Sequence, residues 1–294
     1  MGQRQKPSAL KGIHKVLVTG ATGFIGRHLV AQLENMGKQV VCVSRATGFD
    51  VTRDRLPLKG VTHVFHLAAR IGVEEAWRVP IDYLNTNALG VARVIDQCRG
   101  RCSMTFVSAY VYGNPRRLPI RESDPVDVQN PYALSKLLGE QICAFYARFY
   151  GVPIVALRPF NVYGPGQDSR SVIPHIVEQF LDSQRRVVLV KDLAPSRDYV
   201  YISDAVEGII LASQAASGSV FNIGSGTTYT VKEIITRVSK LSGIRKPYRA
   251  IGQKRAHEID RTCADIAAFR KAVGWRPEIS IDKGLALVVE SMRR

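Results

Sequence analysis

A tyrosine and a lysine four residues apart are the side chains of this sequence best suited to proton transfer. Asn130 is a good N-cap and Pro131 a good first helical residue, so the sequence predicts a helix that begins here. Tyr132 and Lys136 would then lie on one face of that helix. The pKa of a free tyrosine is about 10, and we expect a lysine cation beside the phenol to stabilise the phenolate and lower that pKa. The alternative is a packed tyrosine beside a solvated lysine.

A serine upstream makes this pair more specific, because Tyr-x-x-x-Lys alone often occurs by chance. Ser108 ends the run 104–108, which predicts a buried strand. Ser108, Tyr132 and Lys136 are therefore the candidate catalytic residues.

Three glycines at intervals of three mark a candidate dinucleotide site. They follow the apolar run 16–18 and precede a helical pattern. Glycine lets the backbone turn tightly and lets a pyrophosphate approach, and the free N–H groups of a helix N-terminus would face the phosphates. An ordinary strand–turn–helix is the alternative, but a strand before and a helix after favour dinucleotide binding. The turn residues expected to contact the cofactor are Gly20, Thr22, Gly23, Phe24, Ile25 and Gly26.

The end of the second expected strand, residues 40–43, bears on the choice of cofactor. An acid at this point would bind the ribose hydroxyls of NAD and repel a 2′-phosphate. Ser44 and Arg45 stand here instead, and an arginine suits a phosphate, although a solvated arginine is the plain alternative. NADP(H) is therefore favoured and NAD(H) stays possible. Asp50 and Val51 follow after a very short connection and could meet the adenine.

Strands that alternate with helices predict the element order around these sites. Further strands are expected over 61–69, 104–108 and 154–157, and a helix is expected to open at Asn85-Thr86-Asn87. This alternation predicts an α/β fold with a doubly wound, Rossmann-like parallel sheet. We expect a dinucleotide-binding domain over 13–158, with a return segment over 199–223. A smaller, mixed α/β substrate-binding domain would cover most of 159–294. The small residues after His66, which itself reads as a packed histidine, would let a cofactor cross the strand end at Leu67, Ala68 and Ala69.

The composition excludes several classes of protein. The chain has 294 residues, 46% of them hydrophobic, and a net charge of +16, with its basic residues dispersed. No basic helix of the kind that tracks a nucleic acid is present, so the charge suits anionic small molecules better. No apolar run is long enough to span a bilayer, and residues 1–12 read as a loose leader. The five scattered cysteines, Cys42, Cys98, Cys102, Cys143 and Cys263, indicate reduced thiols, no metal site and a cytoplasmic protein.

Taken together and in order, these motifs resemble the extended short-chain dehydrogenase/reductase family. The resemblance is to its nucleotide-sugar branch of C4 epimerases, 4,6-dehydratases and 4-keto reductases. It rests on residues 19–26, 108–113, 132–136, 158–165, 197–204, 222–226, 264–265 and 274–277, and so covers nearly the whole chain.

The resemblance implies a role for each candidate residue. Ser108 would position the sugar hydroxyl or carbonyl, Tyr132 would be the acid/base and Lys136 would hold the nicotinamide ribose. Asn161, Arg197 and Arg255 match positions that hold the diphosphate end of a nucleotide-sugar, and two guanidiniums with an amide suit a pyrophosphate; surface salt-bridging is the alternative for each. Val190, on a strand edge, would contact the nucleobase. Asn87 and Phe160 are further expected cofactor contacts.

One departure from the family pattern narrows the reaction. Where a 4,6-dehydratase has an Asp-Glu pair, this chain has Ala109 and Tyr110, so water elimination lacks its acid and base. Ser44-Arg45 and the short link from Val43 to Asp50 favour an NADPH-dependent 4-keto-6-deoxy nucleotide-sugar reductase. The alternatives are an NAD-dependent C4 epimerase similar to UDP-glucose 4-epimerases and, outside the enzymes, a non-catalytic NAD(P)-binding protein. The intact catalytic set argues against the last.

A homodimer is the expected assembly. The helix that starts near Tyr132 is a candidate interface, with Leu138 and Phe145 facing outward.

Overall fold

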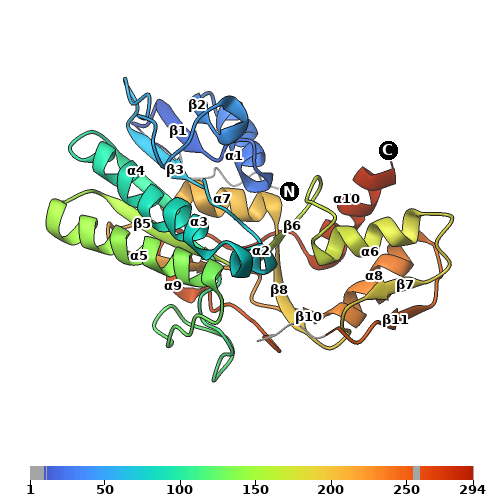
Figure 1. Cartoon of the computed structure of the whole chain (residues 1–294). Helices are drawn as coiled ribbons and strands as arrows, with labels where there is room; N and C mark the ends of the chain where they lie inside the picture. Colours follow the sequence, from blue (N-terminus) through green and yellow to red (C-terminus); the bar gives the residue numbers. More distant parts are fainter. Residues whose placement is uncertain (1–9, 11, 254–258, 294) are drawn as a thin grey trace.

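The chain folds into a larger lobe around a parallel sheet and a smaller lobe beside it (Figure 1). The computed structural model describes residues 10, 12–253 and 259–293. Leu10 is buried in the core, and Lys38 Nζ donates to its carbonyl. The expected loose leader is therefore wrong at Leu10, and the rest of that prediction, over 1–9 and 11, lies outside the described residues.

The central sheet confirms the predicted Rossmann-like α/β fold. Its six strands run in the order β2-β1-β3-β4-β5-β9, and every pairing is parallel. The strands are β1 (Lys15–Thr19), β2 (Gln39–Val43), β3 (His63–His66), β4 (Ser103–Val107), β5 (Ile154–Pro159) and β9 (Val220–Ile223). β3 ends at His66, so the expected strand over 61–69 is too long at its end. The reason is that the N–H groups of Leu67 and Ala68 donate to Thr19 Oγ1.

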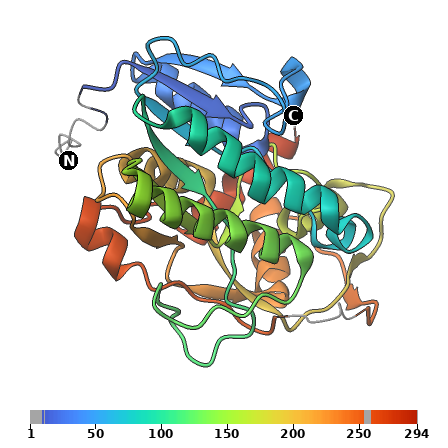
Figure 2. The same cartoon turned by 60° about the vertical axis from the view of Figure 1, so that its left-hand side comes forward.

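Helices cover both faces of this sheet, as a doubly wound fold requires. α1 (Phe24–Asn35) and α7 (Ile202–Ala212) pack together on one face. On the other face α4 (Gly90–Cys98) lies beside α5 (Pro131–Tyr150), as Figure 2 shows. The segment that contains α7 and β9 thus joins the larger lobe, whereas the exact domain boundaries stay a prediction.

The helical run before α4 starts earlier than predicted. α2 (Val73–Arg78) and α3 (Pro80–Leu84) lead into a π-helical turn, η2 (Asn85–Leu89), which continues into α4. The prediction of a helix that opens at Asn85 is therefore wrong, because Pro80 already begins one. A Cβ on Gly139 of α5 would lie 2.9 Å from Asn87 O, so only a glycine lets α5 pack this closely on the turn.

The smaller lobe is mixed α/β, as expected. Helices α6 (Val172–Leu181), α8 (Val231–Ser242) and α10 (Ile281–Arg293) surround short strands. β6 (Asn161–Tyr163) pairs in parallel and β10 (Thr228–Thr230) antiparallel with β8 (Ser196–Tyr201), while β7 (Val188–Val190) pairs with β11 (Tyr248–Ala250). The remaining helix, α9 (Ala267–Val273), contacts β9 of the larger lobe. Within the described chain no helix combines the length and the apolar character needed to cross a membrane.

A buried ion pair connects helix α5 to the sheet. Arg158 Nη2 of β5 lies 2.6 Å from Glu140 Oε2 of α5, and both side chains are less than 8% exposed. Arg158 also donates to the Tyr112 hydroxyl at 2.9 Å, and that hydroxyl donates to Asn222 Oδ1 of β9 at 2.6 Å. The helix, two strands and the segment after β4 are therefore held by one polar network.

We predict that Arg158→Met lowers the free energy of unfolding by roughly 3–5 kcal/mol, because Glu140 is left buried without its cation. Urea denaturation followed by circular dichroism measures the loss. Arg170→Ala is the matched control, since the Arg170–Asp168 pair is exposed to solvent and its loss should hardly change the free energy of unfolding. Equal small losses in the two variants would mean that burial does not govern the Arg158 pair.

Candidate active site

The glycine turn forms a concave backbone surface at the N-terminus of α1. Gly20 has φ +69°, and a Cβ there would lie 2.8 Å from Ala68 N. A Cβ on Gly26 would overlap Gly20 O, so the helix can approach the strand only with glycine at this position. No side chain caps the helix at Gly23, so its first N–H groups are left for another acceptor. All six predicted turn residues lie here, and the shape fits the pyrophosphate of a dinucleotide.

Thr19 fixes the neighbouring strand end against this turn. Its hydroxyl oxygen is buried and accepts hydrogen bonds from Leu67 N at 3.2 Å and Ala68 N at 3.1 Å. The hydroxyl proton is then left for His66 Nδ1 at 2.8 Å. Leu67 and Ala68 therefore lie beside the glycines, as predicted, and Ala69 follows them. The sequence reading missed Thr19, since a threonine that ends a strand carries no distinctive signal.

Ser44 and Arg45 have different roles at the end of β2. The Ser44 side chain is buried and caps the short 3₁₀ helix η1 (Arg45–Thr47), accepting from Thr47 N at 3.3 Å. Arg45 is exposed, and its neighbour Val43 accepts a hydrogen bond from Gly20 N at 2.9 Å. Arg45 therefore follows a strand end whose main chain is hydrogen-bonded to the glycine turn.

Asp50 and Val51 follow in a tight turn. Asp50 Oδ1 accepts from Thr52 N at 2.8 Å and from Thr52 Oγ1 at 2.7 Å, and these bonds lower the pKa of Asp50. Val51 is buried, within reach of Gly90 at the start of α4. One oxygen of the Asp50 carboxylate is thus engaged within its own turn. The expected contact of Asp50 with the adenine stays a prediction.

Two of the three candidate catalytic residues, Ser108 and Lys136, meet at the end of β4, and Tyr132 lies one helical turn before Lys136 in α5. Lys136 Nζ donates to Val107 O at 2.7 Å, directly before Ser108. Ser108 Oγ is buried, and within the described residues it has no hydrogen-bond partner. Tyr132 lies in the first turn of α5, which Asn130 caps as predicted by accepting from Ala133 N at 2.8 Å. A buried hydroxyl without a partner is costly, so Ser108 suits a polar ligand atom.

Burial raises the pKa of Tyr132 and lowers that of Lys136, whereas the sequence predicted a lowered pKa for Tyr132. Desolvation raises the pKa of Tyr132 to about 12, and the neighbouring Tyr83 phenol adds to the effect. Desolvation also lowers the pKa of Lys136 to about 8. The prediction that Lys136 lowers the tyrosine pKa is wrong for the chain by itself, because its ammonium binds Val107 O and the penalty of burial dominates.

Two further expected cofactor residues are buried. Asn87 Oδ1 accepts from Arg70 N at 2.8 Å, while its amide donates to Arg70 O at 3.0 Å and Ser135 Oγ at 2.9 Å. These bonds give Asn87 a supporting role between the segment after β3 and α5. Phe160 packs in a small core cluster with Tyr112 and Ile120.

The expected diphosphate residues lie on neighbouring strands of the smaller lobe. Asn161 of β6 donates to Asp198 O at 3.3 Å, and Arg197 Nη1 of β8 donates to Ser196 O at 3.0 Å. Tyr199, opposite Asn161 in the register, has a buried hydroxyl without a hydrogen-bond partner in the described part of the chain. The sequence reading missed Tyr199, although it stands two residues after Arg197. Arg255 lies outside the described residues.

Val190 lies on β7, an edge strand of the two-stranded sheet that β7 forms with β11, and its contact with the nucleobase stays a prediction. Its carbonyl accepts from Ile251 N at 2.9 Å, because β7 pairs with β11. The amide of Gln179 binds both Leu189 N at 2.9 Å and Leu189 O at 3.0 Å.

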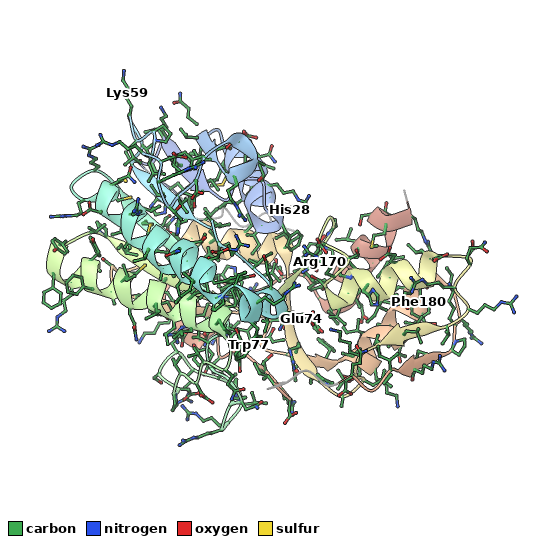
Figure 3. All side chains as sticks on the ribbon, viewed as in Figure 1. His28, Lys59, Glu74, Trp77, Arg170 and Phe180 are labelled. Atoms are coloured by element: carbon green, nitrogen blue, oxygen red, sulfur yellow. The ribbon has the colours of Figure 1, made fainter. Side chains whose placement is uncertain are left out.

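An ion pair joins the two lobes close to these residues. Lys191, directly after β7, places Nζ 2.7 Å from Glu74 Oε1 of α2. Figure 3 shows Glu74 and Trp77 on α2 where the larger lobe faces the smaller one. Both partners of the pair are substantially exposed, so its contribution to stability is small.

We predict a pH-dependent difference in stability between the protein and its Lys136→Met variant. Because the folded pKa of Lys136 is near 8 and the ordinary value is 10.5, the folded state loses this proton first. Between these values the unfolded chain holds the extra proton, so stability relative to the variant rises with pH, by roughly 3 kcal/mol in all. Denaturant titrations at pH 7 and pH 10 measure it; a difference independent of pH would contradict the buried ammonium.

Comparison with known proteins links this geometry to a family. Residues 16–224 match the model of the "NAD dependent epimerase/dehydratase family". The "Uncharacterized UDP-glucose epimerase YtcB" of Bacillus subtilis is 32% identical over 92% of this chain and 95% of its own. The GDP-6-deoxy-D-mannose reductase of Pseudomonas aeruginosa is 29% identical over 94% and 96%. The solved structure of RMD from Pseudomonas aeruginosa, complexed with NADPH, superposes with a TM-score of 0.87 and 28% identity, covering 95% of this chain and 99% of that one.

Proposed function

Because the chain belongs to the NAD-dependent epimerase/dehydratase family, we propose that it is an NADPH-dependent reductase of a 4-keto-6-deoxy nucleotide-sugar. At the coarser level it is an NAD(P)-dependent enzyme, a nucleotide-sugar epimerase or reductase of the extended short-chain dehydrogenase/reductase type. The observation that carries C4 chemistry is the buried Ser108 hydroxyl, which lacks a protein partner at the strand end where Lys136 is anchored.

The residues at the end of β4 divide the chemistry among them. The nicotinamide cofactor supplies the hydride and, when oxidised, a positive charge. Ser108 binds the oxygen on C4 of the sugar, and Tyr132 gives that oxygen its proton as the carbonyl is reduced. Lys136 remains on Val107 O and holds the ribose of the nicotinamide. A phenol whose pKa the chain raises to about 12 stays protonated near neutrality, which is the state a reductase needs at the start of its cycle.

The nucleotide end of the substrate is proposed to lie on the smaller lobe. Asn161 and Arg197 come from adjacent strands and present an amide and a guanidinium. With Arg255 they would hold the diphosphate, and Tyr199 offers an unpaired hydroxyl in the same register.

The choice of NADPH rests on Arg45. It is exposed at the end of β2, beside the glycine turn, where an acid would be expected in an NAD-specific site. Similar solved structures are complexed with NADPH or with NAD, so they support a nicotinamide cofactor and leave the choice to Arg45.

We predict that Arg45→Ala weakens NADP(H) binding by roughly 1.5–3 kcal/mol, because a charge-assisted contact to the 2′-phosphate is lost. Fluorescence titration with NADPH and NADH in parallel measures both affinities. NADH binding should hardly change, which provides the internal control. Equal losses for the two cofactors, or a preference of the unmodified protein for NADH, would rule out this contact.

We predict that the protein consumes one NADPH for each 4-keto-6-deoxy nucleotide-sugar that it reduces. The absorbance of the reduced nicotinamide measures this consumption.

We also predict that Tyr132→Phe lowers turnover by about 10²–10⁴-fold and leaves the affinity for the cofactor unchanged, since the phenol supplies a proton and does not contribute to binding. A Tyr132→Phe protein that retains most of its turnover would remove the acid/base assignment.

The alternative function is an NAD-dependent C4 epimerase, favoured by the similarity to a UDP-glucose epimerase at 32% identity. An epimerase returns the hydride to the same sugar and shows no net change in cofactor absorbance. Interconversion of UDP-glucose and UDP-galactose without net oxidation would replace the reductase by this alternative.

A homodimer is also proposed, through the helices beside the catalytic residues. An open apolar groove of about 470 Å³ lies between the segment 84–92 and α5, and Leu138 and Phe145 line it as expected. Phe145 in the groove is 51% exposed, and Phe149, one turn further along α5, is 63% exposed. A second copy would cover this surface, and sedimentation equilibrium measures whether it does.

A further inference from the structure

The segment that follows β3 is held from both of its sides. Asn87 binds the N–H and the carbonyl of Arg70, at 2.8 and 3.0 Å. Beyond Arg70 the hydroxyl of Tyr83 lies 2.6 Å from Ile71 O and 2.9 Å from Gly72 O. The same hydroxyl lies 2.9 Å from Glu75 Oε2. One phenol therefore connects the turn 71–72 with the first residues of α2.

The turn needs this anchor. Gly72 has φ +109°, outside the conformations that side chains favour. The Tyr83 side chain is fully buried, whereas the side chain of Glu75, an acceptor for its hydroxyl, is partly exposed. Arg70 Nη2 binds Glu75 at 2.7 Å, and its guanidinium lies 5.6 Å from the centre of the Tyr83 ring. The hydroxyl end of the ring is thus held by its single proton, which can be donated to Ile71 O, Gly72 O or the Glu75 carboxylate, and a cation lies on the ring face.

The other side of the same ring meets the proposed acid/base. The rings of Tyr83 and Tyr132 lie 6.2 Å apart at 85°, an edge-to-face contact. The main chain of Tyr132 is linked to the same region, because Ser135 Oγ donates to Tyr132 O at 2.7 Å and accepts from Asn87. The backbone and the ring of Tyr132 are therefore positioned by two separate connections to one turn.

We propose that Tyr83 is a positioning residue: its anchored ring holds the phenol of Tyr132 in the orientation that proton transfer requires. The inference rests on the proposed role of Tyr132. Without its hydroxyl the ring of residue 83 loses its fixed end, and Tyr132 gains freedom to turn away from the substrate oxygen. A small misplacement of a reacting group lowers the rate strongly. Binding should hardly change, because the sites for the cofactor pyrophosphate and the nucleotide lie elsewhere.

The variant that tests this is Tyr83→Phe, which keeps the ring and removes only its anchor. Tyr163→Phe is the matched control: Tyr163 is equally buried, and its hydroxyl donates to Ile281 O at 3.4 Å in the smaller lobe. The first readout needs no substrate. Ring-labelled tyrosine spectra by NMR, with the Tyr132 signal assigned through Tyr132→Phe, report the environment and flipping of the Tyr132 ring. We expect that signal to shift or broaden in Tyr83→Phe and to stay in place in Tyr163→Phe.

The second readout is turnover with NADPH and the 4-keto-6-deoxy sugar, or with UDP-glucose if the protein is an epimerase. We expect kcat to fall about tenfold or more in Tyr83→Phe, with KM and the cofactor Kd within about threefold of their original values. An unmoved Tyr132 signal, or equal effects of Tyr163→Phe on the signal or on kcat, overturns the proposal. If Tyr83→Phe does not fold, Glu75→Gln, at a partly exposed site, takes its place; an unchanged Tyr132 signal there overturns the proposal. Loss of the proposed function shows separately, as turnover that survives Tyr132→Phe.

Discussion

The buried guanidinium of Arg158 is the constraint on which the rest of the active site depends. It ties Glu140 of α5 to β5, and through the Tyr112 hydroxyl it reaches Asn222 of β9. Glu140 stands one turn after Lys136, and Tyr112 stands four residues after Ser108. The helix that carries the catalytic pair and the segment that carries the serine are therefore fixed to the same strand. Both side chains of the pair are almost fully buried, so water can hardly replace either partner, and the geometry of the pair is correspondingly rigid.

Burial that gives this rigidity also sets the electrostatics. The same low-polarity surroundings raise the pKa of Tyr132 and lower that of Lys136 to about 8, so near neutrality the chain by itself holds the phenol protonated and the lysine mostly charged. A sugar carbonyl that is reduced needs a proton, and the protonated phenol of Tyr132 is a suitable donor. Removal of a proton from a sugar hydroxyl needs the phenolate instead, which a positive charge beside the ring would stabilise. The oxidised nicotinamide supplies such a charge. How readily Tyr132 exchanges its proton therefore depends on the charges bound beside it.

Local signals in the sequence predicted the elements that carry the site, and long-range contacts account for what was missed. Asn130 and Pro131 start α5 as expected, and the alternation of apolar runs predicted the parallel sheet, because caps and periodicity depend on neighbouring residues. The early end of β3 depends on Thr19, and the pairing of β7 depends on Ile251, and both are distant in the chain. The prediction for the pKa of Tyr132 was wrong for a similar reason. Spacing places Lys136 near Tyr132, but only the fold shows that Val107 O binds the ammonium. The predicted roles of Ser108, Arg45 and Arg197 stay predictions.

The contacts between the lobes bear on how a reductase differs from an epimerase that uses the same residues. A reductase must release its oxidised cofactor and its product in each cycle, whereas an epimerase keeps the cofactor bound. One exposed contact between the lobes is the ion pair of Lys191 and Glu74, whose side chains are 45% and 69% exposed, and such a pair contributes at most about 1 kcal/mol. Arg45 likewise lies on the exposed rim of the cofactor site, at the end of edge strand β2. Both lobes also share one apolar core, which includes Val18 of β1 and Leu285 of α10, so burial holds the lobes together more than the exposed pair does.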